Sequence, residues 1–163
     1  MDRTNTDLEL ETDEGSGPMR GGNFVVYDDA TGLPIVPGSV VKGHPTIAYG
    51  IALDVRGISM AEAMFLLHDG EDDFWSQITA ALPWAANLDP VRQCALLSMG
   101  YNLGLAGLLG FHNALSCMQN ADWPGTLANL KASAWWNQVG SRAVRIGNMF
   151  LTGQWQLPNQ GVQ

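Results

Sequence analysis

The pattern of apolar residues changes near residue 58, and this single change restricts the folds that the chain can adopt. Upstream of it, short β-type runs alternate with turn residues; the runs lie at 24–27, 33–36, 40–41 and 46–53, and the turns at 29–32 and 37–38. Downstream of it, apolar side chains recur at helical spacing behind residues that cap helix starts. No strand–helix–strand unit occurs, so the pattern predicts a small antiparallel sheet followed by helices, which is an α+β fold.

Capping signals place the predicted helices. Ser59-Met60-Ala61-Glu62 has the form of a capping box and opens the longest of them. Further helices are predicted behind Asp89-Pro90, Asp122 and Ser141. Thr6–Glu9 also has capping-box form and predicts a short first helix that ends near Glu14. We therefore expect one domain of 163 residues, with a sheet lobe at about 15–57, a connecting helix at 59–80 and a helical lobe at 82–157.

Composition and residue spacing exclude several classes of protein. The hydrophobic content is 46%, as in globular chains, and no apolar run approaches the roughly 18 residues of a membrane span. We therefore expect no stable membrane insertion and no cleavable signal peptide at this N-terminus. Cys94 and Cys117 lie in apolar helical patterns and are expected to be core residues. The histidines, His44, His68 and His112, have no ligand spacing, so no metal site is expected.

The charge is distributed unevenly along the chain. Residues 1–73 hold 14 acidic and 4 basic residues, a net charge of −10, whereas residues 74–163 hold 2 acidic and 4 basic residues, a net charge of +2. Neither half carries the cluster of basic residues that binds phosphate groups. Nucleic acid is therefore not expected as a partner.

Three residues of the N-terminal half could carry chemistry. Glu14 lies where the first predicted helix ends, and the helix dipole disfavours an ionised carboxylate there, which suits a general acid. Asp29 opens a turn, where aspartate ordinarily bonds its own backbone, and Asp28 competes with it for any functional role. Thr46 is typical of an ordinary β-branched strand residue. Taken singly, none of these residues indicates a function.

Taken together, these residues lie in a recognisable series of motifs. Glu14-Gly15, Tyr27-Asp28-Asp29 with Gly32, and Thr46-Ile47-Ala48-Tyr49-Gly50 resemble the E-G … Y-x-D-x-x-G … T-I-G-Y-G signature of phage lysozymes of the T-even type, the endolysins of glycoside hydrolase family 24. The resemblance continues in four blocks: VRQCALLSMGYNLG (91–104), GFHNAL (110–115), WWNQ (135–138) and SRAVRIGNMFLTGQW (141–155). The blocks follow the family's order over nearly the whole chain, which is more specific than any one motif.

The resemblance implies a lysozyme-like fold, with a small antiparallel sheet lobe and a larger helical lobe joined by a long helix, and a cleft between the lobes. It implies an N-acetylmuramidase that cleaves the β-1,4 bond between N-acetylmuramic acid and N-acetylglucosamine in peptidoglycan. Glu14 would be the general acid, and Asp29, which fits the Y-x-D register whereas Asp28 does not, would position the water with Thr46. The substrate-binding positions implied by the family are Tyr101, Asn129, Gln138 and Arg142.

The resemblance also implies how such a protein is used. Two carboxylates and a water suffice for the chemistry, so no cofactor is expected, and we expect a monomer. The protein would accumulate in the host cytoplasm and reach the cell wall when a separate holin-type protein permeabilises the membrane. Two alternatives stay open: a lytic transglycosylase, which would release anhydro-muramyl products and would not need Asp29, and a non-catalytic peptidoglycan-binding virion component. The presence of Glu14, Asp29 and Thr46 argues against both.

The chain departs from the family pattern in several places. Fourteen residues separate Glu14 from Asp29 and sixteen separate Asp29 from Thr46, both longer than usual, and we expect the extra residues at 17–23 and 34–44 to enlarge the sheet lobe. Ala48 stands at a usual glycine, and Ile51 stands where histidine often follows GYG. In the family an arginine at the position of Arg142 approaches the glutamate and would lower its pKa, against the effect of the helix end. The sequence leaves open which of these effects prevails.

Overall fold

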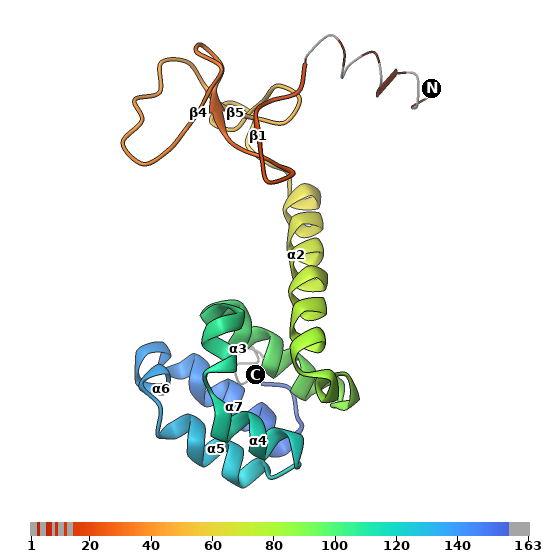
Figure 1. Ribbon diagram of the computed structural model, residues 1–163, viewed down its shortest axis with the longest axis vertical. Helices are drawn as coiled ribbons and strands as arrows, with labels where there is room; N and C mark the ends of the chain where they lie inside the picture. The colour runs from red at the N-terminus through yellow and green to blue at the C-terminus, as the bar shows by residue number, and fades with distance from the viewer. Residues whose placement is uncertain (1–2, 4–5, 8, 10–11, 13–14, 157–163) are drawn as a thin grey trace, which may run out of the picture. The chain divides into compact units, whose positions relative to one another are not determined.

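A computed structural model describes residues 3, 6–7, 9, 12 and 15–156, and the chain divides into two compact units at residues 65 and 66. In the N-terminal segment, the described residues Arg3, Thr6, Asp7, Glu9 and Thr12 have helical conformation. Glu14, the predicted general acid, lies outside the described residues. The first unit carries the strands (Figure 1), and the second carries most of the helices.

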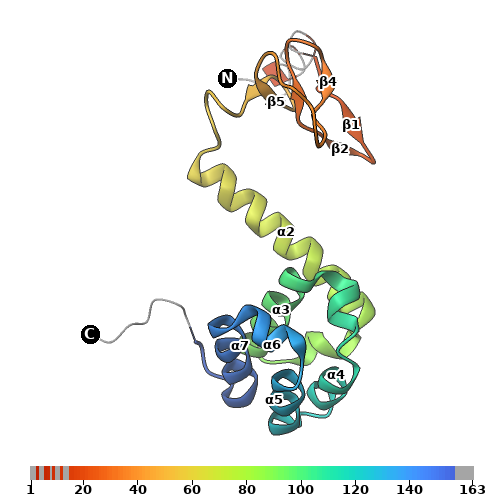
Figure 2. The same cartoon turned by 90° about the vertical axis from the view of Figure 1, so that its left-hand side faces the viewer.

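The first unit contains two small antiparallel sheets (Figure 2). One is the hairpin of β1 (Met19–Arg20) and β2 (Asn23–Phe24). The other has the strand order β4-β3-β5-β6, and its strands are β3 (Tyr27–Asp28), β4 (Leu33–Pro34), β5 (Pro45–Ile47) and β6 (Ile51–Ala52). In this register Thr46 on the inner strand β5 lies opposite Tyr27 on one side and Ala52 on the other.

Three of the predicted strand runs are corrected by the structure. The predicted run at 46–53 is divided into β5 and β6 by a turn at 48–50. The predicted run at 24–27 is divided, because Phe24 pairs in the first sheet and Tyr27 pairs in the second. The predicted strand at 40–41 is wrong, since these residues lie in the loop between β4 and β5, and Val40 is 84% exposed. Just beyond them, the backbone N–H groups of Lys42 and Gly43 bond to the Asp28 carboxylate. A side chain thus takes the place of a partner strand in this loop.

The turn between β5 and β6 contains Ala48, the residue that departs from the T-I-G-Y-G motif. Ala48 has a φ of 53°, a left-handed conformation in which an L-residue with a Cβ is strained. Its carbonyl accepts a hydrogen bond from the Gly17 N–H at 2.9 Å. A Cβ on Gly17 would lie 2.8 Å from the Tyr27 ring, so this close approach requires glycine. The turn is therefore held from the segment before β1.

Helix α2 (Met60–Ala81) begins as the sequence predicts. Ser59 Oγ accepts from the Glu62 N–H at 3.2 Å, and Glu62 Oε2 accepts from the Ser59 N–H at 2.7 Å, which confirms the capping box. Arg56 also donates to the Glu62 carboxylate at 2.8 Å, and this bond, together with those from Ser59, lowers the pKa of Glu62 to about 2. The division between the two units falls within α2, and Ile78 near its end is buried in the second unit.

The second unit is helical, and its elements after α2 are η1 (Pro83–Asn87), α3 (Pro90–Leu109), α4 (His112–Gln119), α5 (Trp123–Lys131), α6 (Ala134–Val139) and α7 (Ser141–Thr152). The predicted caps at Asp89 and Asp122 are confirmed, because each carboxylate accepts from backbone N–H groups of the first turn. The predicted cap at Ser141 is wrong. Gly140 precedes α7 with a φ of 55°, a positive value that glycine adopts without strain, and Ser141 is the first helical residue.

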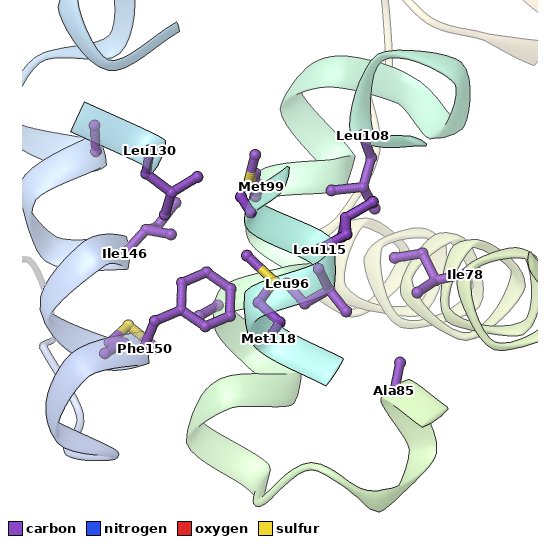
Figure 3. Close-up of a cluster of buried hydrophobic side chains, with 14 of the residues drawn as sticks. Ile78, Ala85, Leu96, Met99, Leu108, Leu115, Met118, Leu130, Ile146 and Phe150 are labelled. Carbon is purple, nitrogen blue, oxygen red and sulfur yellow. The ribbon is translucent and has the colours of Figure 1, made fainter. Parts of the chain in front are cut away.

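The hydrophobic core of the described residues lies in the helical unit, where α7 packs on α3 and α5. Figure 3 shows Phe150 of α7 pointing toward the side chains of α3 and α4, among them Leu96 and Met118. In the first unit, by contrast, Asp28 and Thr46 are the buried polar residues, and each is hydrogen-bonded. Small antiparallel sheets followed by a helical unit confirm the α+β fold class.

No single helix among the described residues is long and apolar enough to cross a membrane. The pair α3 and α4 reaches the required length and composition together, but it is bent by 107°.

Candidate active site

The two aspartates at the end of β3 have different environments. Asp28 is buried, and its carboxylate accepts from the backbone N–H groups of Lys42 and Gly43 at 2.9 Å and of Ala30 at 3.1 Å. The bond from Lys42, supported by the other two, holds the pKa of Asp28 below its ordinary value, although burial opposes this. Asp29 is exposed. Asp28 is therefore a structural carboxylate, whereas the Asp29 carboxylate is open to a ligand.

The strand register places Asp29 and Thr46 on the same face of the four-stranded sheet. Tyr27 lies opposite Thr46, and the next pair on that face, Asp29 and His44, is joined by a hydrogen bond of 3.1 Å from the Asp29 N–H to the His44 carbonyl. Thr46 Oγ1 donates to the same carbonyl at 3.2 Å. The His44 carbonyl thus accepts from both residues that are predicted to hold the water, and fixes their relative position.

The Asp29 side chain is itself held by the backbone of the opposite strand. Its Oδ1 accepts from the His44 N–H at 2.7 Å. A Cβ on the neighbouring Gly43 would overlap this oxygen and lie 2.9 Å from the Ala30 backbone nitrogen, so the close approach requires glycine at position 43. One oxygen of the exposed carboxylate is therefore fixed by the chain, and the other is available to bind a water or a substrate hydroxyl.

In the helical unit, Tyr101 and Arg142 line one cavity of about 220 Å³, together with Leu67, Glu71, Cys94, Leu97 and Ser98. The Tyr101 ring is half exposed and packs edge-on against Phe74, with ring centres 5.8 Å apart. Arg142 Nη2 donates to the Ser98 carbonyl at 2.7 Å and to Ser98 Oγ at 3.1 Å. The cavity therefore offers an aromatic face next to an anchored cation.

The other two expected substrate-binding residues lie elsewhere in the unit. Asn129 lines a cavity of about 320 Å³ with residues of the 110–114 segment, Ala132 and Ser133. Its Nδ2 is used inside the protein, because it donates to the Gly125 carbonyl at 2.8 Å. Gln138 is exposed on α6 and lines neither cavity. The structure thus brings Tyr101 and Arg142 together and places Asn129 and Gln138 apart from them.

Two residues that contact these sites, Ser98 and His44, are not among those predicted from the sequence. Ser98 lies four residues after Cys94 and three before Tyr101, so helical spacing places all three on one face of the helix predicted behind Asp89-Pro90. His44 lies two residues before Thr46, and the two-residue period of a strand puts both on one face. Only the pairing of β3 with β5 shows that His44 also contacts Asp29.

The extra residues that lengthen the Glu14–Asp29 and Asp29–Thr46 spacings form local structure in the first unit. The segment at 17–23 forms most of the β1–β2 hairpin, and the segment at 34–44 forms the end of β4 and the loop between β4 and β5. Side chains of both segments line a cavity of about 580 Å³, with Arg20 and Lys42 as its basic residues. This cavity also contacts Asp28.

Comparisons with known proteins point in the same direction as the motifs. The chain is 32% identical over 156 residues to the pre-baseplate central spike protein Gp5 of Enterobacteria phage T4, a match that covers 85% of this chain and 27% of that protein. It is 28% and 31% identical over 67 residues to two proteins of Dictyostelium discoideum named probable T4-type lysozyme 1 and 2. Each of these matches covers 41% of this chain and 39% of the relative. No protein-family model matches the chain.

The chain thus spans about a quarter to two fifths of the length of these relatives. Its similarity to T4-type lysozymes supports a lysozyme-like protein, over part of the chain and at modest identity.

Proposed function

We propose that the protein is a peptidoglycan hydrolase, an N-acetylmuramidase with Glu14 as the general acid and with Asp29 and Thr46 as the residues that position the attacking water. The observation that carries the proposal is the pairing of an exposed Asp29 carboxylate with the Thr46 hydroxyl on one sheet face, both bonded to His44. The order of the motifs in the sequence and the similarity to T4-type lysozymes also support it.

The hydrogen bonds of the sheet define how a water would be held. Thr46 Oγ1 donates its hydrogen to the His44 carbonyl, so it can only accept from a water. The ionised Asp29 carboxylate is also an acceptor. A water that donates one hydrogen to each residue keeps a lone pair for attack on the anomeric carbon. As the new C–O bond forms, the water gives one proton to the Asp29 carboxylate, while Glu14 protonates the departing glycosidic oxygen. An aromatic ring such as that of Tyr101 can stack on a sugar face.

Analysis of the products released from purified peptidoglycan tests this function. We expect reducing N-acetylmuramic acid ends, first formed in the α configuration, because attack by a positioned water inverts the β bond. The inverting geometry corresponds to carboxyl groups about 6.5–9.5 Å apart, a spacing that leaves room for the water. Anhydro-muramyl ends would instead identify a lytic transglycosylase, a β-configured first product would make Asp29 a nucleophile, and bound but intact glycan would identify a non-catalytic binder.

A second candidate concerns the setting in which the protein acts. The match to a baseplate spike protein covers 85% of this chain, which favours a virion component. The other setting is that of an endolysin, a monomer that stays in the host cytoplasm until a holin-type protein releases it. Mass spectrometry of purified phage particles and of infected-cell cytosol distinguishes the two, since a virion component remains with the particle through gradient purification and an endolysin does not.

The uneven charge predicts how salt affects the reaction. Residues 1–73, which include the sheet unit, carry a net charge of −10, and peptidoglycan carries carboxylates, so encounter is slowed by repulsion. Salt relieves this, because the Debye length shrinks from about 30 Å at 0.01 M to about 10 Å at 0.1 M. We expect the initial rate of lysis of permeabilised cells at fixed pH to rise roughly two-fold over this range. A rate that falls steadily from the lowest salt would show that basic residues such as Arg142 and Arg145 govern encounter.

A further inference from the structure

His44 lies between two carboxylates on the face of the sheet that carries Thr46. On one side, its backbone N–H donates to Asp29 Oδ1 at 2.7 Å and its carbonyl accepts from the Asp29 N–H at 3.1 Å. On the other side, its ring Nδ1 lies 3.0 Å from Asp54 Oδ2. The register explains this arrangement, because Thr46 lies opposite Ala52 and residue 44 therefore lies opposite residue 54. Asp29, His44 and Asp54 thus form a row across three neighbouring segments of the sheet.

We propose that His44 is a positioning residue for Asp29, and that its imidazolium, held in place by Asp54, supplies the positive charge that stabilises the Asp29 carboxylate in its working geometry. The inference rests on the proposed function, because it gives Asp29 the task of holding water. His44 bonds to Asp29 through its backbone N–H, and its imidazole is held by Asp54 on the same sheet face, where the charge of Asp29 acts on it. An imidazolium in this place reduces the repulsion between two carboxylates that share one row.

The charge of His44 depends on its surroundings in a way that can be tested. The hydrogen bond and charge of Asp54 raise the pKa of His44 above its ordinary value, and the charge of Asp29 adds to this, although partial desolvation opposes it. Asp28 binds the backbone of Lys42 and Gly43, beside the row, and the Lys42 side chain belongs to the same loop. His44 is therefore cationic below its raised pKa and loses its charge as the pH rises through that value.

The pH dependence of hydrolysis tests the role of the pair. Asp54→Asn keeps the shape but removes the charge, so the alkaline limb of kcat against pH should move down by about 0.5–1 pH unit. His44→Gln keeps the backbone N–H that bonds Asp29 but lacks the cation, and it should lower kcat by about 3–10-fold with little change in KM. His44→Lys should recover part of kcat and keep it to higher pH, because lysine stays charged there.

A matched control removes another exposed ion pair of the same unit. Arg56 and Glu62 form a pair with 49% and 42% of their side chains exposed, compared with 52% and 46% for His44 and Asp54. Arg56→Gln should leave the pH profile where it is. An Asp54→Asn protein whose alkaline limb coincides with that of the wild type and of the control would overturn the role of His44.

NMR titration of the histidine rings separates this proposal from the proposed function. The pKa of His44 should fall in both Asp54→Asn and Asp29→Asn, because each variant removes a charge that raises it. An unchanged His44 pKa in both variants would refute the proposed interaction of His44 with Asp29 and Asp54, even if the protein hydrolyses peptidoglycan. Conversely, if the His44 pKa falls in both variants but the wild-type protein does not cleave purified peptidoglycan, the interaction of His44 with both carboxylates is supported and the proposed hydrolase function is refuted.

Discussion

Replacing Glu14 with glutamine is expected to reduce peptidoglycan hydrolysis by about 10²–10⁴-fold while the protein stays folded. The amide has nearly the shape of the carboxyl group, but it has no proton to give to the leaving glycosidic oxygen. Without that proton, the departing sugar must leave as an alkoxide, and positioning of the water by Asp29 and Thr46 does not compensate for this. The measurement is the release of reducing ends from purified peptidoglycan per mole of folded enzyme.

The matched control for this experiment is Glu9→Gln, since Glu9 is an exposed acid of the same segment with no assigned role. It should retain wild-type activity, and both variants should have the circular dichroism spectrum and melting temperature of the wild type. Near-normal hydrolysis by a folded Glu14→Gln protein would reassign the general acid, and Glu11 would be the first residue to examine.

The parts of the fold that the sequence predicted correctly depend on interactions between residues close in the chain. The capping box at Ser59 and Glu62 and the caps at Asp89 and Asp122 each join groups no more than three residues apart. Such bonds leave a readable local pattern. The predicted cap at Ser141 is wrong because α7 begins after Gly140, which has a positive φ, and no side-chain bond caps the helix start.

The parts that the sequence could not predict depend on contacts between distant residues. Val40 and Val41 have high strand propensity, yet the loop takes its shape from the bond between Asp28 and the Lys42 N–H, fourteen positions away. The same bond explains why Asp28 is buried while the adjacent Asp29 is exposed. Composition and turn signals do not predict this difference. The contact of His44 with Asp29 spans fifteen positions and also follows from strand pairing alone. The roles of Glu14, Asp29 and Thr46 themselves remain predictions from the motifs.

The adjacent aspartates allow one further decisive experiment, in which the same substitution is made at each position in turn. Asp29→Asn should lower hydrolysis by about 10²–10³-fold, because the amide weakens the acceptor that orients the water, and the melting temperature should change little for an exposed residue. Reducing-end release at 25 °C and thermal unfolding, measured on both variants, give the two readouts. Each variant is the control for the other, because Asp28 and Asp29 are adjacent in the chain but belong to different faces of the sheet.

Asp28→Asn should give the opposite result, with hydrolysis largely retained at 25 °C and a melting temperature about 5 °C lower. Its buried carboxylate accepts three backbone N–H bonds, and an amide can accept only through one oxygen. Because the pKa of Asp28 is lowered in the folded protein, its contribution to stability is complete above its ordinary value of 3.8 and is lost as the pH falls through the lowered value. The fall in melting temperature at acidic pH should therefore be smaller in Asp28→Asn than in the wild type, and it should persist in Asp29→Asn. If instead folded Asp28→Asn loses hydrolysis and Asp29→Asn keeps it, the water-positioning role belongs to Asp28, and the motif register that favours Asp29 is misleading.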